Sequence, residues 1–378
     1  MSFNLKKWSL KILWLGNIVI CLLALLALAA PFANPAKFWP IAIAGIGFPI
    51  SIVIVALFAL LWLFLKPKRA LLSAITMLLC SPAFYLSFGL HPFSNFTQTK
   101  DSSALRVMSW NVGLMNYETL DTNLAIAYNK QIFEKIKQSN ADVLCLQEFF
   151  SAIVPGNHYN LMDSLSRNLG YPYFYFSRDV PKINNQFYSG TIIYSKYPIV
   201  DSSIQRFPFK GLFSGSVIKT GIAKAGDTID IVSSRLQIMR FSGEEYRQLS
   251  ELKHLQRNSY LNSKSLIGKL RTGYYFLSKQ ATIVDSMIRS SNRATLFGGD
   301  INNIPISHTY ATVKGNLHDA WANGGWGIGR TFHSISPTLR VDQLFYSHHF
   351  SLQQVRIVKA KKEADHNALL ADFLLKTK

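Results

Sequence analysis

Three long apolar runs begin the chain, and shorter apolar runs alternate with helical patterns after them. The long runs are Ile12–Pro31, Phe38–Leu65 and Ala70–Leu90. A membrane-crossing helix needs roughly 20 apolar residues at a rise of 1.5 Å per residue, so each run is long enough. A cleaved signal peptide would explain the first run alone. The pattern therefore predicts three transmembrane helices at these positions.

Basic residues flank these runs unevenly. They precede the first run and separate the second from the third: Lys6, Lys7, Lys11, Lys66, Lys68 and Arg69. Because basic flanks stay on the cytoplasmic side, the N-terminus is expected in the cytoplasm. Three crossings would then place the rest of the chain in the periplasm or outside the cell. Residues 1–91 become a membrane domain, 92–103 a polar linker and 104–378 an outer domain.

The outer domain mixes two periodicities. Short apolar runs that stop at a polar residue predict strands, and apolar residues three or four apart predict helices. The predicted strands are Ala104–Trp110, Ala141–Gln147, Gly190–Tyr194, Thr228–Ser233, Ala294–Phe297, Val341–Tyr346 and Ala368–Leu375. The predicted helices are Thr122–Gln138, Ser242–Leu270 and Phe276–Ile288. This mixture favours a layered sheet covered by helices.

The charge of the chain follows the same division. The first 100 residues hold no Asp or Glu and eight of the 40 Lys and Arg, so residues 101–378 carry 32 basic and 21 acidic residues, or +11. This balance favours anionic partners such as phosphate esters, nucleic acid or an anionic membrane surface, although solubility alone explains it equally well. Only Cys145 lies in the outer domain, which therefore has no internal disulfide and no CxxC metal motif.

Polar side chains stand at the ends of several predicted strands. They are Asn111, Glu148, Asp300, Asn302, Asp342, Asp365 and His366. Strand ends that meet at one edge of a sheet can build a site on a rigid scaffold. Carboxylates with an imidazole are the groups that metal-assisted attack on a phosphate ester needs. Taken singly, each tract is as well explained by a turn or a solvated side chain.

Together, and in this order, the tracts resemble one family. They are Ser109-Trp110-Asn111-Val112, Leu146-Gln147-Glu148, Gly190–Ile199, Gly299–Asn302, Arg340–Phe345 and Asp365-His366-Asn367. The set resembles the endonuclease/exonuclease/phosphatase superfamily of DNase I-like phosphoesterases, over about residues 104–376. The resemblance implies a four-layered α/β sandwich, in which two packed mixed sheets are flanked by helices.

The resemblance also implies a metal site. Glu148 matches the main magnesium ligand, Asn111 stands beside it, and Asp365 matches a residue near the metal. Mg²⁺ prefers hard oxygen ligands and keeps several waters, so one or two carboxylates suffice. Mg²⁺ is therefore the expected cofactor, with Mn²⁺ able to replace it.

The remaining tracts match catalytic roles in the family. Asp300 resembles the residue that orients or deprotonates the attacking water, and Asn302 resembles a contact to a phosphate oxygen. His366 resembles the histidine that faces the phosphate, and Asp342 resembles the carboxylate that orients it. A carboxylate bonded to imidazole raises its pKa and favours a cation that can stabilise the transition state.

One tract departs from the family pattern. Many members carry Asn-x-His-Leu after a central strand, where this chain has Ser233-Ser234-Arg235-Leu236. Arg235 thus stands where a histidine is usual. Arginine does not release a proton at working pH but can bind phosphate through two hydrogen bonds. Arg235 is therefore expected to contact the substrate phosphate.

The sequence predicts a membrane-anchored, metal-dependent phosphoesterase, acting on phosphodiesters through a water positioned by the metal and an Asp. The basic surface favours a nuclease-like activity, while the anchor favours a phospholipid or sphingolipid substrate. The basic stretch Ser242–Thr272 fits an arm facing either substrate or a solvated helix. The alternative, motivated by Arg235, is a catalytically degenerate domain that acts as a binding module at the cell surface. No obligate protein partner is evident.

Overall fold

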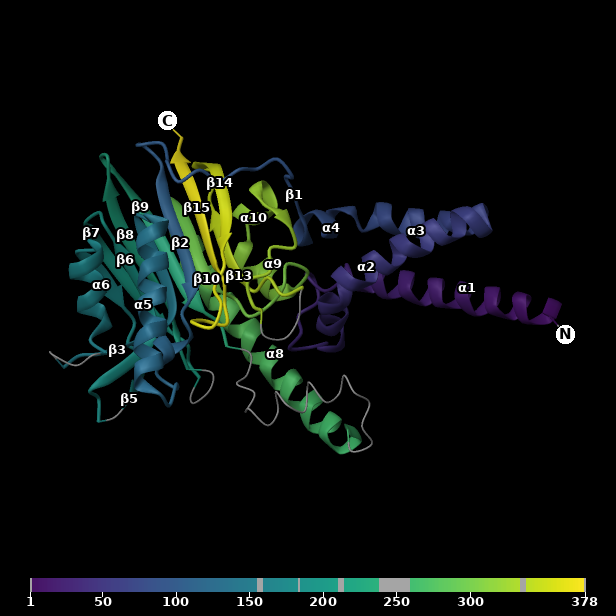
Figure 1. Ribbon diagram of the computed structural model, residues 1–378, viewed down its shortest axis with the longest axis horizontal. Helices are drawn as coiled ribbons and strands as arrows, with labels where there is room; N and C mark the ends of the chain where they lie inside the picture. Colours follow the sequence, from purple (N-terminus) through teal and green to yellow (C-terminus); the bar gives the residue numbers. More distant parts are fainter. Residues whose placement is uncertain are drawn as a thin grey trace.

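The N-terminal helices project from a mixed α/β domain (Figure 1). This computed structural model describes residues 2–154, 159–182, 184–209, 214–237, 259–333 and 338–376. Helix α1 (Ser2–Ala27) runs toward the domain, and α2 (Pro40–Leu65) begins beside the domain and runs away from it. Lys7–Ala27 and all of α2 are each long and apolar enough to cross a membrane.

The third predicted membrane helix, residues 70–90, is not a single helix. This segment forms α3 (Pro67–Leu79) and α4 (Ser81–Ser87), which are bent by 58° relative to each other and are followed by β1 (Gly89–Leu90). Pro82 has no N–H and crowds the carbonyl four residues earlier, Leu78. The Ser81 hydroxyl donates a hydrogen bond of 2.8 Å to the Leu78 carbonyl oxygen. The prediction of three transmembrane helices is therefore wrong for the third, since two helices qualify among the described residues; a third crossing would need the bent pair to act as one span.

The domain is built on two mixed sheets. One has the order β14 (Phe350–Val358), β15 (Ala368–Leu375), β2 (Leu105–Asn111), β3 (Val143–Ala152), β6 (Phe187–Ser195) and β4 (Tyr173–Phe176), with β5 (Val180–Lys182) also on β6. The other has the order β11 (His318–Asp319), β13 (Asp342–Tyr346), β10 (Ala294–Asp300), β9 (Asp227–Arg235), β8 (Ser216–Lys224) and β7 (Ile199–Arg206). Strands β2 and β3 are parallel, as are β9 and β10, while the other pairs are antiparallel. Each predicted strand forms, Ala368–Leu375 with the predicted bounds and the others with shifted ends.

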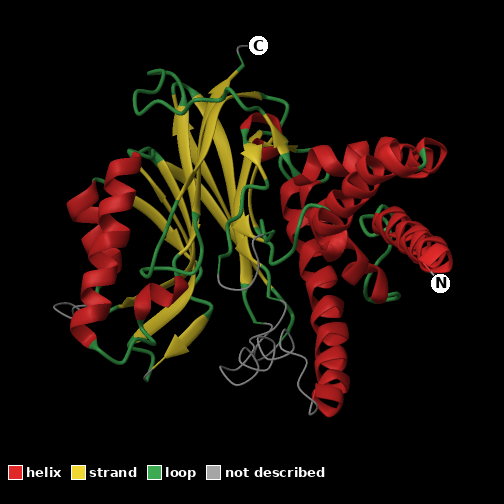
Figure 2. Cartoon of the chain, turned by 45° about the vertical axis from the view of Figure 1, so that its right-hand side comes forward, coloured by secondary structure: helices red, strands yellow, loops and turns green. Residues whose placement is uncertain are grey.

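Three apolar clusters define the layers of this domain. One lies between the two sheets and contains Cys145, which is fully buried as predicted. A second joins the seven-stranded sheet to α5 (Thr122–Ser139) and α6 (Leu161–Leu169). The third joins the six-stranded sheet to α8 (Ser259–Arg289) and α9 (His308–Lys314). The order helix, sheet, sheet, helix is visible in Figure 2 and agrees with the predicted mixed α/β class.

Helix α8 differs from the prediction. A break was expected between Leu270 and Phe276, but the helix is continuous from Ser259 to Arg289. Tyr274, Leu277 and Ala281 are buried in the cluster against the sheet, and this packing outweighs the low helix propensity of Gly273. The expected start of this helix at Ser242 lies outside the described residues.

The N-terminal helices share contacts with the domain. Ala42 of α2 belongs to the apolar cluster of α8 and β10, and Ile306, from the loop after β10, belongs to the cluster of α1 and α2. Arg340 donates a hydrogen bond of 2.5 Å from Nη2 to the Leu86 carbonyl oxygen in α4. The predicted linker also packs on the domain, because Lys100 forms an ion pair with Asp142. Remaining short elements are η1 (Gly113–Asn116), α10 (Ala320–Gly324) and β12 (Trp326–Gly327).

Candidate active site

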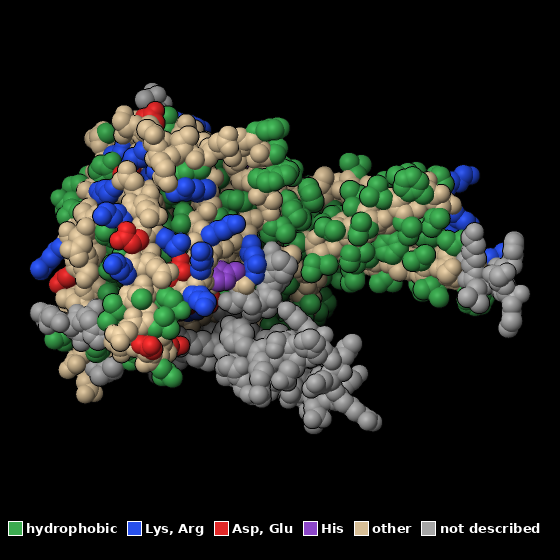
Figure 3. Space-filling model, viewed as in Figure 1, with side chains coloured by type: hydrophobic (Ala, Val, Ile, Leu, Met, Phe, Trp, Pro, Cys, Tyr) green, Lys and Arg blue, Asp and Glu red, His purple; other side chains and the backbone are tan. Residues whose placement is uncertain are grey.

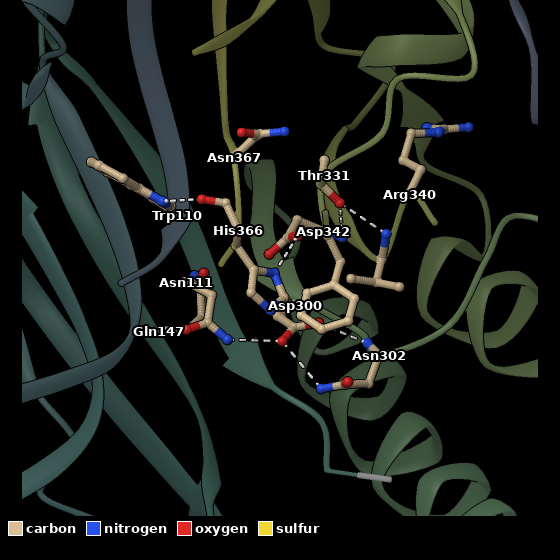
Figure 4. Close-up of polar contacts among 12 residues, drawn as sticks. Trp110, Asn111, Gln147, Asp300, Asn302, Thr331, Arg340, Asp342, His366 and Asn367 are labelled. Atoms are coloured by element: carbon tan, nitrogen blue, oxygen red, sulfur yellow. Dashed lines mark hydrogen bonds and ion pairs between the residues drawn. The ribbon is translucent and has the colours of Figure 1, made fainter. Parts of the chain in front are cut away.

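The predicted site residues meet at one end of the two sheets. A cavity of about 380 Å³ is lined by Glu148, Arg235, Asn302, Asp365 and His366, with other residues of the surrounding loops. Figure 4 shows the polar groups behind it, which come from both sheets. Segments that are far apart in sequence therefore supply one site, as the strand-end pattern predicts.

Three of the charged residues are neighbours across the six-stranded sheet. Asp300 pairs in register with Arg235 on β9 and with Asp342 on β13. Paired residues on adjacent strands project from the same face, so their side chains are brought together. Gly299 allows β10 to lie this close to β9, because a Cβ at this position would lie 2.4 Å from the Ser234 carbonyl oxygen. The Gly-Asp tract is thus a packing requirement of the sheet that carries the site.

Asp300 is fixed by amide donors on both sides. Asn111 donates from Nδ2 to its Oδ2 at 3.0 Å, and Asn302 donates from its backbone N to Oδ1 at 2.9 Å and from Nδ2 to Oδ2 at 3.1 Å. Burial, reinforced by the negative charge of Asp342, raises the pKa of Asp300 to about 6, while His366 and Arg235 oppose this rise. A carboxylate with such a pKa is ionised near neutral pH yet basic enough to accept a proton.

His366 and Asp342 form a buried pair. The His366 Nδ1 and Asp342 Oδ2 atoms are 2.8 Å apart. Burial alone would lower the pKa of His366, but the charge and hydrogen bond of Asp342, with further help from Asp300 and Asp365, raise it to about 10. The imidazole is therefore a cation at neutral pH, and its ring lies between Asp342 and Asp300 (Figure 4).

Two contacts that hold this pair were not predicted from the sequence. Trp110 donates from Nε1 to the His366 carbonyl oxygen at 2.8 Å. The Thr331 hydroxyl oxygen accepts hydrogen bonds from the backbone N of Val341 at 2.9 Å and of Asp342 at 3.1 Å. Trp110 belongs to the tract Ser109–Val112 that resembles the family, so its tract marked it as a candidate site residue. Thr331 lies in none of these tracts, and nothing in the sequence around it indicates a role in the site.

Glu148 reaches the cavity through a distortion of β3. The pairing of β3 with β6 shifts between Leu146 and Phe149, and Glu148 has a φ of +49°. A bulge of this kind turns a side chain away from the regular alternation of the strand. The Glu148 Oε1 atom lies 2.6 Å from Nη2 of Arg235 and accepts a hydrogen bond of 3.1 Å from Nδ2 of Asn111. Arg235 is thus paired with the predicted metal ligand.

The donor set in the cavity suits a hard divalent cation. Glu148 and Asp365 line the same cavity and offer carboxylate oxygens, and Asp365 is exposed. Asn111 presents its Nδ2 to the carboxylates, while its Oδ1 accepts a hydrogen bond of 3.1 Å from the Gly113 backbone N. In this arrangement Asn111 aligns the two carboxylates Glu148 and Asp300.

A second group could hold a cation on distance alone. The nearest ligand atoms of Asp300, Asp342 and His366 lie within 4.8 Å of one another. However, a protonated His366 that shares a short hydrogen bond with Asp342 repels a cation. Carboxylates that face the open cavity, such as Glu148, are therefore the better candidates for a metal.

The sequence profile of the endonuclease/exonuclease/phosphatase family matches residues 108–366, and the chain belongs to this family. It is thereby classed with hydrolases that act on phosphate esters. Residues 10–86 match a second family, described only as a domain of unknown function. No curated protein matches the chain by sequence.

Several solved structures resemble the domain. A family member from Beutenbergia cavernae is 17% identical, with 72% of each chain covered and a TM-score of 0.51. The human Nocturnin catalytic domain with a bound sulfate is 17% identical over 75% of this chain and 97% of that chain, with a TM-score of 0.48. TDP2 from D. rerio, complexed with a single-strand DNA product, is 16% identical over 72% of this chain and 99% of that chain, with a TM-score of 0.46. At such low identity the likeness to the Beutenbergia cavernae structure indicates the fold alone.

Proposed function

We propose that this protein is a membrane-anchored phosphodiesterase that uses a divalent cation. The observation that carries the proposal is a cavity lined by Glu148 and His366 with two buried carboxylates bonded to its wall. Asp342 bonds to His366, and Asn111 donates to both Asp300 and Glu148. A basic carboxylate beside a cationic imidazole is suited to activate water next to a phosphate whose negative charge increases during attack.

In the proposed reaction, Asp300 accepts the proton of the attacking water as its oxygen bonds to phosphorus. The Asn302 and Asn111 amides hold the Asp300 carboxylate in position. The His366 cation stabilises the charge on the phosphoryl oxygens, and Asp342 keeps this imidazole protonated and oriented. The bond from phosphorus to the leaving oxygen breaks, and the leaving alkoxide takes a proton from solvent.

Glu148 and Asp365 would hold the cation, with Asn111 aligning Glu148. When bound, Mg²⁺ or Mn²⁺ neutralises phosphate charge and lowers the barrier to departure of the leaving group. Arg235 and Asn302 line the same cavity. The Arg235 guanidinium would bind phosphate oxygens after releasing Glu148, whereas Asn302 Nδ2 donates to the Leu236 carbonyl oxygen and to Asp300 and would have to release one of them.

The proposal is tested with the purified full chain in detergent. A panel of plasmid DNA, single-stranded oligonucleotide, phospholipid and sphingolipid headgroup esters and a chromogenic phosphodiester is assayed with and without Mg²⁺ or Mn²⁺. We expect metal-dependent hydrolysis, which Asp300→Asn lowers about 100- to 10,000-fold because the general base is lost. Asp201→Asn, at an exposed carboxylate on β7 that does not line the cavity, is the control and should leave the rate unchanged.

A binding module remains the second candidate function, since one contact favours it. The Arg235–Glu148 ion pair of 2.6 Å satisfies the charge of the predicted metal ligand without any metal. If the wild-type protein hydrolyses no ester in the panel but binds one of them, and Asp300→Asn binds it equally well, the binding role replaces the enzymatic one.

We further propose that the domain lies outside the cytoplasm. The N-terminus and the turn between α2 and α3 lie at the end of the helices away from the domain (Figure 1), and Figure 3 shows Lys and Arg side chains at that tip. Basic flanks favour the cytoplasmic side. In spheroplasts, a membrane-impermeant maleimide should label Ser102→Cys but not Lys68→Cys; the native cysteines are buried. The opposite labelling would place the domain in the cytoplasm.

A further inference from the structure

A second, larger cavity lies near the junction of the N-terminal helices and the domain. It measures about 700 Å³, and residues of β12, β14 and the loop Gly329–His333 line it. None of its lining residues lines the candidate active site cavity. It is therefore a separate feature that the proposed reaction does not use.

The lining of this cavity is cationic. It includes Arg330, Arg356 and Lys359 and contains no Asp or Glu. Among the described residues, no carboxylate forms an ion pair with any of these three side chains. No carboxylate lines the cavity, so these cations favour a bound anion, while the Asp372 carboxylate, outside the lining, offsets part of the charge on Arg356.

Arg356 is the most informative of the three. Its guanidinium carbon lies 4.3 Å from the centroid of the Phe96 ring, and its Nε atom is buried with no hydrogen-bond partner. Because the Nε atom is enclosed by protein, a ligand in the cavity would meet the Nη groups of this guanidinium. The guanidinium group is suited to bind phosphate oxygens through two hydrogen bonds.

The cavity lies beside the segment that leaves the apolar helices. Strand β1 directly follows α4 and pairs with β12, so that Leu90 lies opposite Trp326. Trp326, a lining residue, is 60% exposed, and Phe93, three residues after β1, is 92% exposed. Exposed aromatic rings next to membrane-crossing helices are typical of the level of lipid headgroups. Figure 3 shows Lys and Arg side chains gathering on this face of the domain, next to the apolar helices.

We propose that this cavity binds the phosphate headgroup of an anionic phospholipid from the bilayer that holds the N-terminal helices. The cations supply charge complementarity, the Nη groups of Arg356 supply donors for phosphate oxygens, and the exposed rings of Trp326 and Phe93 enter the interfacial region beside the headgroup. A free polyanion would use the same cations but would leave the two rings in water. This inference goes beyond the proposed activity and does not depend on it.

The test uses the full chain in a mild detergent and native mass spectrometry with added phosphatidylglycerol or phosphatidylcholine. Wild-type protein is expected to retain phosphatidylglycerol in preference to phosphatidylcholine. The double variant Arg356→Gln/Lys359→Gln should lower phosphatidylglycerol retention about thirtyfold, since each basic side chain near an anionic surface contributes about fivefold. The matched control Lys130→Gln/Arg167→Gln removes one exposed Lys and one exposed Arg, neither of which lines this cavity, and should retain the preference.

Three results would overturn the inference. Equal retention of both lipids by the wild type would exclude a headgroup site, and an unchanged preference in the double variant would place that site elsewhere. Displacement of phosphatidylglycerol by a single-stranded oligonucleotide at equal concentration would make a soluble polyanion the ligand. If the double variant does not fold, the single variant Lys359→Gln, at an exposed position, should still retain about fivefold less phosphatidylglycerol than the wild type.

Discussion

At the scale of single residues, the site depends on how Asp342 sets the charge of its neighbours. Asp342 is fully buried and bonds to His366. Among the described residues it forms no ion pair with an arginine. Its negative charge raises the pKa of His366 to about 10 and contributes to raising the pKa of Asp300 to about 6. One carboxylate therefore keeps the His366 imidazole cationic and makes the Asp300 carboxylate more basic.

The pH dependence of hydrolysis follows from these two values. The rate should rise as pH increases through about 6, where Asp300 loses its proton, and fall near pH 10, where His366 loses its proton. In Asp342→Asn both pKa values drop, so both limbs of the profile should move to lower pH. The measurement is kcat/KM between pH 4 and 11, with Asp201→Asn as control. An acid limb that stays in place would mean that a group other than Asp300 controls it.

Arg235 makes a separate prediction about metal binding. Its Nη2 lies 2.6 Å from Glu148 Oε1, so the guanidinium must give up this contact before a cation can use that oxygen. Removing a charged hydrogen-bond partner changes energies by about 1.5–3 kcal/mol. Arg235→Gln should therefore bind Mn²⁺ about tenfold or more tightly in calorimetry, while its KM for substrate rises.

The control for this measurement is Arg289→Gln. Arg289 pairs with Asp285 at 2.7 Å on α8, and neither residue lines a cavity that contains Glu148. This variant should leave Mn²⁺ affinity unchanged, and Glu148→Gln should weaken it strongly. Equal Mn²⁺ affinity in wild type and Arg235→Gln would contradict competition between arginine and metal.

At the scale of elements, two local distortions position the site on otherwise regular strands. The bulge in β3 directs Glu148 into the cavity, and Gly299 lets β9 and β10 approach closely before Asp300. Gln147 links the sheets behind the site, donating from Nε2 to the Ser233 hydroxyl at 3.1 Å and to the Gly298 carbonyl at 3.3 Å. The site residues are thus held by the packing of strands, which favours fixed geometry.

A methyl group at Gly299 should disturb this arrangement. In Gly299→Ala the added Cβ would lie 2.4 Å from the Ser234 carbonyl oxygen, so β9 and β10 must separate. We expect a loss of about 1–3 kcal/mol in the free energy of unfolding and a marked loss of activity. Gly268→Ala is the matched control, since nothing lies within 4 Å of its Cβ in α8; it should be neutral or stabilising by up to about 1 kcal/mol. Thermal unfolding of both variants checks this prediction.

At the scale of the whole molecule, the N-terminal helices are part of the domain's packing. The loop that follows Asn302 contributes Ile306 to the apolar cluster of α1 and α2. Arg340, two residues before β13, donates a hydrogen bond to Leu86 of α4. The same strand begins at Asp342. Movements of the helices can therefore reach the candidate active site through short connections.

Gly45 tests this coupling. A Cβ at Gly45 in α2 would lie 2.4 Å from the Ile306 carbonyl oxygen, whereas a Cβ at Gly47 would meet nothing within 4 Å. Gly45→Ala should shift the loop after Asn302, lowering kcat and the melting temperature, while Gly47→Ala should match the wild type in both. Equal kcat and melting temperatures in the two variants would indicate that the helices act only as an anchor.

Local pattern was enough to predict much of this protein. The length of the apolar runs located the long helices and the strands, because a membrane span needs about 20 apolar residues and a strand buried on both faces needs only a short apolar run. Asp300, Asp342 and His366 could be selected from the sequence, since their tracts stand at strand ends and together resemble one family. The family itself was therefore accessible without coordinates.

Other properties depend on contacts between distant segments. The bend at Cys80, the continuity of α8 and the roles of Thr331 and Trp110 arise from packing and hydrogen bonds that no local pattern specifies. The ion pair of Arg235 with Glu148 joins strands of different sheets, and the basic cavity at Arg356 joins four segments of the chain. Sequence by itself determined which residue types and elements are present; only the tertiary structure decided which charges lie close enough to change one another's chemistry, because Coulomb energies depend on distance and burial.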